Sequence, residues 1–410
     1  MPTRSALDLR LLGGLSPGEF LARHWQKKPL LIRGAFEDKP ALPDRDALFA
    51  LAARDDVESR LITSFDGDGA MTHGPMAHWT MAHGPLERMP RQKRDWTLLV
   101  QGVNLFDARA DALMRRFDFV STIRLDDLMI SYAVDGGSVG PHFDSYDVFL
   151  LQVEGARRWR WSSQRDLTLV DGAPLKLLKH FAPTDEAVLE PGDMLYLPPN
   201  CAHEGTAMGS CMTASIGFRA PSWNELAQEF LFAMAEREWP DGRYADGGRK
   251  ATAAPAAIDR EFVDAVGAQL SRIDWSRNDV EQFIGRYFSE PKAHVFFESP
   301  RPLSQRQFIA RARARGLALD IRTTMLYRGR TGFICGESFV IPRSVRRAFA
   351  QLANRRTLDA AIVADAFRDE ANDDANDDAC NDAAIALLHA WWSNGWIHIS
   401  SGRGSNDQPR

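Results

Sequence analysis

The chain has 410 residues, of which 44% are hydrophobic and 26% charged, so it can bury cores and is not expected to be disordered. This length predicts two or three domains. The formal net charge of −5 at pH 7 argues against a protein that mainly wraps nucleic acid. The four cysteines include no C-x-x-C pair, so no zinc ribbon or redox dithiol is visible, and a reducing compartment is expected.

The N-terminal sequence does not have the features of a targeting segment. Arg4, Asp8 and Arg10 interrupt its apolar stretch, and no small-residue cleavage site follows. No run of the chain approaches the roughly 18 consecutive apolar residues that a membrane-spanning helix needs. We therefore expect a soluble, cytoplasmic protein that does not associate with membranes.

Residues 1 to about 220 carry short β-like runs separated by Gly, Pro and Asp. The runs are LMISYAV (128–134), DVFLLQV (147–153), ARRWRW (156–161), MLYLP (194–198) and TASIGF (213–218). Short strands with frequent turn residues are typical of an all-β barrel or sandwich. The runs do not alternate strictly with helices, which argues against a doubly wound α/β sheet.

The next region, from 221 to about 300, has a helical pattern. Four apolar residues recur at the spacing of one helix face, namely Leu226, Phe230, Ala233 and Met234. A polar, Gly- and Ala-rich connection over 240–256 separates them from a second helix-like stretch. Apolar helix faces of this kind either pair with a second copy of the chain or pack onto the β domain, and the sequence leaves both open.

The last region, about 301–410, mixes helices with a hairpin, a combination that suits a winged-helix type of module. RQFIARARARG, SVRRAFAQLA and AAIALLHAWWSNGW are predicted helices, and TTMLYRGRTGFICGESFVI is predicted to form two strands around a turn. The Asn/Asp/Ala repeat at 369–383 is interpreted as a solvated acidic insertion. Because of this repeat and the net charge, we expect the module to dock protein or support a dimer rather than bind DNA directly.

A possible metal-binding motif lies in GPHFDSYDVFLLQVEGARRWRW (140–161), where His142 and Asp144 stand two residues apart. On a β-strand both side chains would point to one face, where an imidazole nitrogen and a carboxylate oxygen can bind one metal ion. An H-x-D tripeptide alone is weak, because a chain of this length often contains one by chance. The alternative is a surface histidine beside a turn aspartate.

A second histidine strengthens the metal hypothesis. His203 follows a predicted turn and strand in LEPGDMLYLPPNCAHEGTA (189–207). Two histidines and one carboxylate form the facial triad of non-haem Fe(II) oxygenases, which leaves three metal positions open. The interior of a β barrel suits such a site because its walls exclude bulk water.

These segments together resemble the Jumonji-C family of Fe(II)- and 2-oxoglutarate-dependent oxygenases. More closely, the segments resemble the bacterial ribosomal oxygenases, which hydroxylate an arginine in a large-subunit ribosomal protein. The likeness is carried by FLARHWQKKPLLIRGAF (20–36), DDLMISYAV (126–134), the 140–161 segment, EPGDMLYLPPNCAHEG (190–205) and IGFRAP (216–221). The acidic repeat departs from the family pattern.

The resemblance implies an architecture in three parts. Residues 1–220 would form a mainly β catalytic domain, a double-stranded β-helix or jelly-roll of the cupin type. Residues 221–300 would form a helical dimerisation segment, and residues 301–410 a winged-helix module. The expected assembly is a homodimer, and the expected partner is a large-subunit ribosomal protein as substrate.

The resemblance also implies the chemistry and its residues. The reaction would be arginine 3-hydroxylation with Fe(II) as cofactor and 2-oxoglutarate and dioxygen as cosubstrates. His142, Asp144 and His203 would bind the iron, and Arg157 and Ser131 would hold the C5 carboxylate of 2-oxoglutarate.

The strand pattern agrees with this role for Arg157. If 156–161 is a strand, Arg157 shares a face with Trp159 and Trp161, while its arginine neighbours point the other way. An arginine facing the interior needs a partner, and its donor fork fits a carboxylate with two parallel hydrogen bonds. A structural carboxylate of the protein is the alternative partner.

An arginine substrate should meet acidic or aromatic side chains at the mouth of the barrel. Four residues near the metal motifs are candidates: Asp135, Tyr146, Asp147 and Glu204. Asp135 ranks first because the glycine-rich segment 135–141 leads directly to the first metal-ligand candidate. Each of the four could equally be a loop residue or a helix cap.

Other interpretations stay open at this point. His73, His78 and His83 are evenly spaced and could form a second metal site, but a loop covering the barrel is favoured because no carboxylate or cysteine is in phase with them. The enzyme could instead hydroxylate another residue, such as a histidine, or act as a demethylase. A non-enzymatic cupin-like scaffold with a structural metal is the remaining class.

Overall fold

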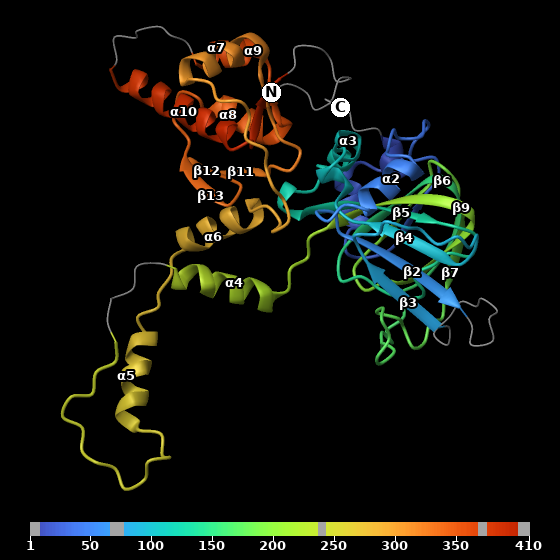
Figure 1. Ribbon diagram of the computed structural model, residues 1–410, viewed down its shortest axis with the longest axis horizontal. Helices are drawn as coiled ribbons and strands as arrows, with labels where there is room; N and C mark the ends of the chain where they lie inside the picture. Colours follow the sequence, from blue (N-terminus) through green and yellow to red (C-terminus); the bar gives the residue numbers. More distant parts are fainter. Residues whose placement is uncertain (1–8, 66–77, 237–242, 368–374, 401–410) are drawn as a thin grey trace. The chain divides into compact units, whose positions relative to one another are not determined.

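The computed structural model describes residues 9–65, 78–236, 243–367 and 375–400. It divides into two compact units, shown in Figure 1. The first contains Met1–Ala220 with Lys292–Glu298 and Leu319–Arg322, and the second contains Pro221–Pro291, Ser299–Ala318 and Thr323–Arg410. Because the helical segment and the C-terminal region share the second unit, their separation into two domains stays a prediction.

The first unit is built around one antiparallel sheet. Its strands are β1 Leu30–Ile32, β2 Ser59–Phe65, β3 His78–His83, β4 Trp96–Val100, β5 Leu125–Ala133, β6 Val148–Ser162, β7 Asp185–Leu189, β8 Met194–Leu197 and β9 Ala202–Phe218. Its helices are η1 Leu9–Leu12, α1 Pro17–Arg23, α2 Arg45–Ala52, η2 Val103–Leu105, α3 Ala108–Met114, η3 Arg115–Phe117 and η4 Thr122–Arg124.

The strand order is β1-β8-β6-β9-β5-β4-β2-β3, with β7 also paired to β6. The predicted runs 147–153 and 156–161 are joined in the single strand β6, and 213–218 is the end of the longer β9. The first half of β6 pairs with β8 and the end of β9, whereas its second half pairs with β7 and the start of β9. This double pairing, in which two long strands each serve both halves of the sheet, gives the cupin-like, jelly-roll arrangement that the sequence predicts.

The two faces of this sheet bury different clusters. One face packs against the N-terminal helices through aromatic side chains, with Phe20, Phe149 and Tyr196 in mutual contact. The other face is the interior of the barrel, where Val148, Leu150, Trp159 and Trp161 belong to a separate buried cluster. The first half of β6, residues 148–153, is therefore buried on two sides, and this explains why its sequence does not alternate between apolar and polar residues. In the second half of β6 the alternation returns, with Arg158 exposed between the buried Arg157 and Trp159.

The second unit combines helices with two small sheets. Its helices are α4 Trp223–Ala235, α5 Arg260–Leu270, α6 Arg277–Ser289, α7 Gln305–Arg315, α8 Arg346–Arg355, α9 Ala360–Ala366 and α10 Ala375–Ser393. Its strands are β10 Leu317–Leu319, β11 Met325–Arg328, β12 Thr331–Ile334, β13 Glu337–Val340, β14 Thr357–Leu358 and β15 Ile397–Ile399. The region predicted as two strands forms the three-stranded sheet β11-β12-β13, because a second turn at Cys335–Gly336 follows the first.

Two further expectations are changed by the structure. The segment from His78 to His83, predicted as a loop, is strand β3 paired with β2, while His73 lies outside the described residues. The end of the acidic repeat begins helix α10, and residues 369–374 of the repeat lie outside the described residues. Among the residues that the structure describes, no helix has the length and apolar character needed to cross a membrane.

Candidate metal centre

Backbone pairing brings the two metal-ligand segments together. His142 and His203 form an isolated antiparallel bridge in which each amide donates to the carbonyl of the other, at N···O distances of 2.9 and 2.8 Å. The Asn200 amide donates to the Asp144 carbonyl at 2.7 Å. The H-x-D tripeptide therefore lies on a loop held by single bridges, which corrects the expectation that it belongs to a regular strand.

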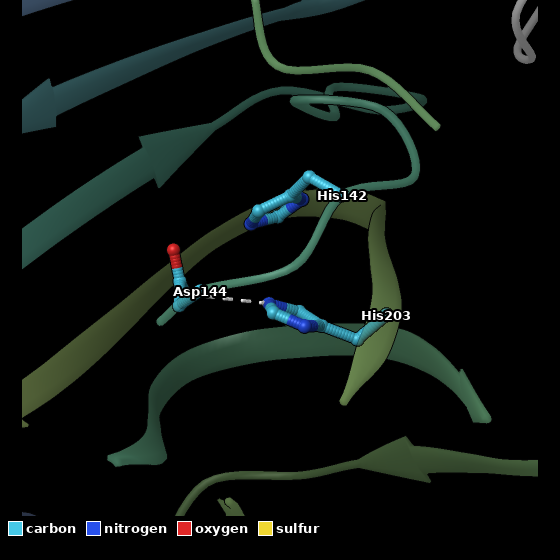
Figure 2. Close-up of side chains that lie close together, drawn as sticks. All are labelled: His142, Asp144 and His203. Atoms are coloured by element: carbon cyan, nitrogen blue, oxygen red, sulfur yellow. Dashed lines mark ion pairs between the residues drawn. The ribbon is translucent and has the colours of Figure 1, made fainter. Parts of the chain in front are cut away.

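The three side chains point toward one another, as Figure 2 shows. His142, Asp144 and His203 each offer a ligand atom, and these atoms lie within 4.8 Å of one another. The Nε2 atom of His203 is 3.8 Å from Oδ2 of Asp144, and the two imidazole centroids are 4.2 Å apart. This is the only such group of three or more in the part of the chain that the structure describes.

Hydrogen bonds fix the tautomers of both imidazoles. Nδ1 of His142 donates to the Gly140 carbonyl and Nδ1 of His203 to the Cys201 carbonyl, each at 2.9 Å. A carbonyl oxygen can only accept, so each Nδ1 carries the proton and each Nε2 keeps its lone pair for a metal. Burial, followed by the neighbouring His142, lowers the pKa of His203 to about 4, so this ligand is neutral at pH 7 and ready to bind.

Deeper in the barrel lies a buried cation. Arg157 is 3% exposed, and its Nη1 donates to the hydroxyl oxygens of Ser131 at 3.1 Å and Thr213 at 3.4 Å. Burial lowers the pKa of its guanidinium. It makes no ion pair with any carboxylate of the described residues, so the alternative of a structural carboxylate partner is not observed.

Two buried donors face no acceptor beside this cation. Arg157 Nε and Trp159 Nε1 are both without a hydrogen-bond partner among the described residues. A Cβ added to Gly205 would lie 2.9 Å from Arg157 Nε and 2.8 Å from the Trp159 ring, so only glycine leaves this space open. Unsatisfied buried donors are costly, and a bound carboxylate would satisfy them.

Tyr146 and Asp127 lie together at the mouth of the site. Both approach the inner face of Gly217, where an added Cβ would be 3.3 Å from Asp127 Oδ1 and 4.0 Å from the Tyr146 ring. The side chain of Tyr146 is 39% exposed, and its pKa is raised by desolvation and then by the carboxylate of Asp144. Burial also raises the pKa of Asp127, whose Oδ2 accepts the Gly102 amide at 3.0 Å.

Asp147 was a candidate for substrate binding, and the structure corrects this. Its carboxylate is completely buried and accepts hydrogen bonds from Tyr196 at 2.6 Å and Gln26 at 3.1 Å. Tyr196 belongs to the aromatic face of the sheet, opposite the barrel interior. Asp147 therefore stabilises the fold and does not face the site.

The predicted substrate-binding role of Glu204 is also wrong, because its side chain does not face the site. Glu204 follows His203 directly on β9, so its side chain points to the opposite face, where it pairs with Arg160 of β6 and is 1% exposed. Asp135 is half-exposed, but Arg94 binds one of its oxygens at 2.6 Å and the Gly209 amide binds the other at 3.0 Å. A substrate role for Asp135 stays a prediction.

The structure adds residues that sequence reasoning missed. Asp127 is one, although its spacing from Ser131 places both on one face of a strand and could have indicated it. Thr213 is another, and it carried no signal, because only the pairing of distant strands brings it to the guanidinium. The Trp159 N–H was also missed, although Trp159 shares the predicted strand face of Arg157.

Comparison with known proteins agrees with this geometry. Residues 112–226 match the model of the JmjC domain, and residues 271–397 match the model of the ROXA-like winged helix. The chain is 34% identical over 359 residues to the ribosomal protein uL16 3-hydroxylase of Escherichia coli K12, which covers 86% of this chain and 92% of that protein.

Solved structures extend the comparison to three dimensions. The X-ray structure of E. coli YcfD matches with a TM-score of 0.77 at 31% identity, covering 94% of this chain and 98% of that one. The same ribosomal oxygenase in complex with cobalt and 2-oxoglutarate matches over the same shares with a TM-score of 0.74 and 31% identity. This protein therefore belongs to the family of JmjC-domain ribosomal oxygenases.

Proposed function

We propose that this protein is an Fe(II)- and 2-oxoglutarate-dependent hydroxylase that acts on an arginine of a large-subunit ribosomal protein in the cytoplasm. The observation that carries the proposal is the pairing of a three-residue metal cluster with a buried arginine that has no carboxylate partner among the described residues. The name of the E. coli relative supports the substrate class, and the YcfD complex with cobalt and 2-oxoglutarate supports the cofactors.

The residues present fit both groups. His142, Asp144 and His203 would hold the metal through two imidazole nitrogens and one carboxylate oxygen, the donor set of an Fe(II) oxygenase site. Arg157 and Ser131 would hold the distal carboxylate of 2-oxoglutarate, and Trp159 offers one more donor nearby. When bound, iron and 2-oxoglutarate supply the oxidising power that inserts one atom of dioxygen into a C–H bond.

The mouth of the site suits a substrate guanidinium. Asp127 supplies a half-buried carboxylate that forms no ion pair among the described residues, and Tyr146 supplies an aromatic ring beside it. A carboxylate accepts the N–H groups of a guanidinium, and an aromatic face attracts the same cation. The chain's own contribution to the reaction is then to orient the substrate C–H bond and to exclude water.

Mass spectrometry tests the proposed activity. Purified protein incubated with Fe(II), 2-oxoglutarate, air and unmodified large-subunit ribosomal proteins should add 16 Da to one of them, at an arginine located by fragmentation. A formaldehyde assay on the same mixture should stay negative, because hydroxylation on carbon leaves a stable alcohol whereas demethylation releases formaldehyde. Absence of the added mass from a preparation that still turns over 2-oxoglutarate would contradict the substrate assignment.

The assembly we propose is a homodimer formed by the helical segment. Helix α5 has no buried residue, and Phe262, Val266 and Leu270 form an apolar stripe along it with exposed fractions of 43%, 39% and 59%. On α4, Phe232 is 68% exposed. Exposed apolar stripes of this kind are typical of faces that bind another protein, and a second copy of this chain presents the same stripe.

Charge on this stripe should dissociate the dimer. Val266→Glu combined with Leu270→Glu is expected to shift the mass measured by light scattering from two chains to one, with dimer affinity reduced at least about 100-fold because charges would be buried. Val340→Glu is the matched control, since Val340 is a 65% exposed apolar residue on β13, away from the stripe. A wild-type protein that is already monomeric would contradict the proposed assembly.

A further inference from the structure

The residues of strand β6 that face the barrel interior are even-numbered in its first half and odd-numbered in its second half. In its first half, Val148 and Leu150 face the interior cluster, whereas Phe149 and Leu151 face the aromatic core on the other side. In its second half, the odd-numbered residues Trp159 and Trp161 face the interior. Since side chains of a regular strand alternate strictly, the parity must switch between these halves.

A β-bulge makes this switch. The pairing of β6 with β9 shifts register between Gln152 and Glu154 and again between Glu154 and Ala156. Gly155 lies here with φ of +59°, and a Cβ on it would overlap the Ser210 carbonyl oxygen. Without the bulge, Arg157 would emerge on the face opposite Gln152 and could not reach the barrel interior.

The side chain of Gln152 holds the bulge together. It is completely buried, and its Nε2 donates to the Glu154 carbonyl at 2.8 Å and the Gly155 carbonyl at 3.2 Å. Its Oε1 accepts the Thr213 hydroxyl at 3.0 Å. Because that hydrogen is committed to Gln152, the Thr213 oxygen presents a lone pair to Arg157 Nη1.

We infer that Gln152 is a positioning residue: it fixes the bulge that turns Arg157 inward and thereby sets the affinity for the distal carboxylate of the cosubstrate. The inference rests on the proposed function, because it gives that buried guanidinium its ligand. Gln152 contacts neither the metal-ligand cluster nor the position of a substrate, so its effect should be confined to one end of the cosubstrate.

Binding measurements on Gln152→Met test this role without turnover. Calorimetry with Mn(II)-loaded protein compares 2-oxoglutarate with 2-oxopentanoate, which has the same keto acid group but no distal carboxylate. The variant should bind 2-oxoglutarate about tenfold or more weakly, as expected when a residue that orients a ligand-binding group is lost. Its affinity for 2-oxopentanoate should stay within about twofold of wild type, because the loss concerns only the guanidinium contact.

Asn104→Ala is the matched control for general destabilisation. Asn104 is also a buried amide, 2% exposed, and its Oδ1 accepts the Leu128 amide at 2.9 Å in the same unit. The inference would be overturned if the control lost as much 2-oxoglutarate affinity as Q152M. It would also be overturned if Q152M lost affinity for 2-oxoglutarate and 2-oxopentanoate equally. If Q152M does not fold, Gly155→Ala perturbs the same bulge. A loss of affinity for 2-oxoglutarate but not for 2-oxopentanoate in that variant supports the inference, and an unchanged 2-oxoglutarate affinity overturns it.

The same measurements separate this inference from the proposed function. A wild-type protein that binds neither acid would overturn the proposed function and the inference with it. If the wild-type protein and a folded Q152M variant bind 2-oxoglutarate with equal affinity, the inference is overturned and the proposed function is unaffected.

Discussion

Replacement of His203 by alanine is expected to lower iron-dependent turnover of 2-oxoglutarate by at least about 1,000-fold. The variant keeps only His142 and Asp144 of the three-residue cluster, and an ion held by two protein ligands has neither the affinity nor the fixed geometry of the complete triad. The imidazole of His203 is 2% exposed and its Nδ1 is bonded to the Cys201 carbonyl, so alanine removes both this hydrogen bond and the ligand atom Nε2.

Succinate formation measured beside Mn(II) affinity checks this expectation. His180→Ala is the control, because this exposed histidine lies outside the cluster. The control should retain wild-type turnover and metal affinity, and the His203 variant should lose both while its thermal unfolding stays cooperative. Wild-type turnover by a folded H203A protein would show that the cluster is not the metal centre.

Much of the metal centre could be predicted from sequence because its signals are local or nearly so. Two ligand candidates sit two residues apart, and the third follows a turn and a short apolar strand that any reader of the sequence can recognise. What the sequence did not provide was the way they meet. The loop that carries His142 is held by single backbone bridges to the start of β9. Isolated bridges of this kind produce no hydrophobic periodicity in the sequence, so they could not be predicted from it.

The substrate side was harder for a definite physical reason. Asp147 and Glu204 stand close to the metal motifs along the chain, yet adjacent residues of a strand point to opposite faces, so nearness in sequence placed them on the wrong side. The opposite difficulty affects Arg157. Its inward direction agrees with the local strand pattern, but it depends on a bulge whose existence follows only from the pairing of β6 with β9.

The second large effect is expected at Asp127, which does not lie next to the metal motifs in the sequence. Asp127→Asn is expected to lower kcat/KM for the ribosomal protein substrate by about 100-fold, because loss of the charge partner of a buried guanidinium typically costs about 2–5 kcal/mol. Asparagine keeps the shape of the side chain and can still accept the Gly102 amide, so the change removes charge more than structure. Binding of 2-oxoglutarate should be unaffected, since its proposed anchors are Arg157 and Ser131.

The pH dependence of substrate binding should follow the same group. Burial raises the pKa of Asp127, so on acidification its carboxylate becomes protonated at a higher pH than an exposed aspartate would. A protonated Asp127 no longer attracts a guanidinium, so kcat/KM should fall as the pH decreases toward this raised pKa. In the Asp127→Asn variant that part of the pH profile should be absent.

Asp126→Asn is the control that isolates this role, because Asp126 is the neighbouring carboxylate and is already paired with Lys292 at 3.2 Å and Arg219 at 3.4 Å. A substitution that acted only through local charge or strand stability would affect both variants alike. A loss confined to Asp127→Asn, with 2-oxoglutarate binding intact, would place the substrate cation beside Tyr146 and Gly217, where Asp127 lies. Equal kcat/KM values for wild type and Asp127→Asn would instead exclude Asp127 from the substrate site. Asp135 would then be the next candidate, and its half-exposed carboxylate would have to release Arg94 to bind substrate.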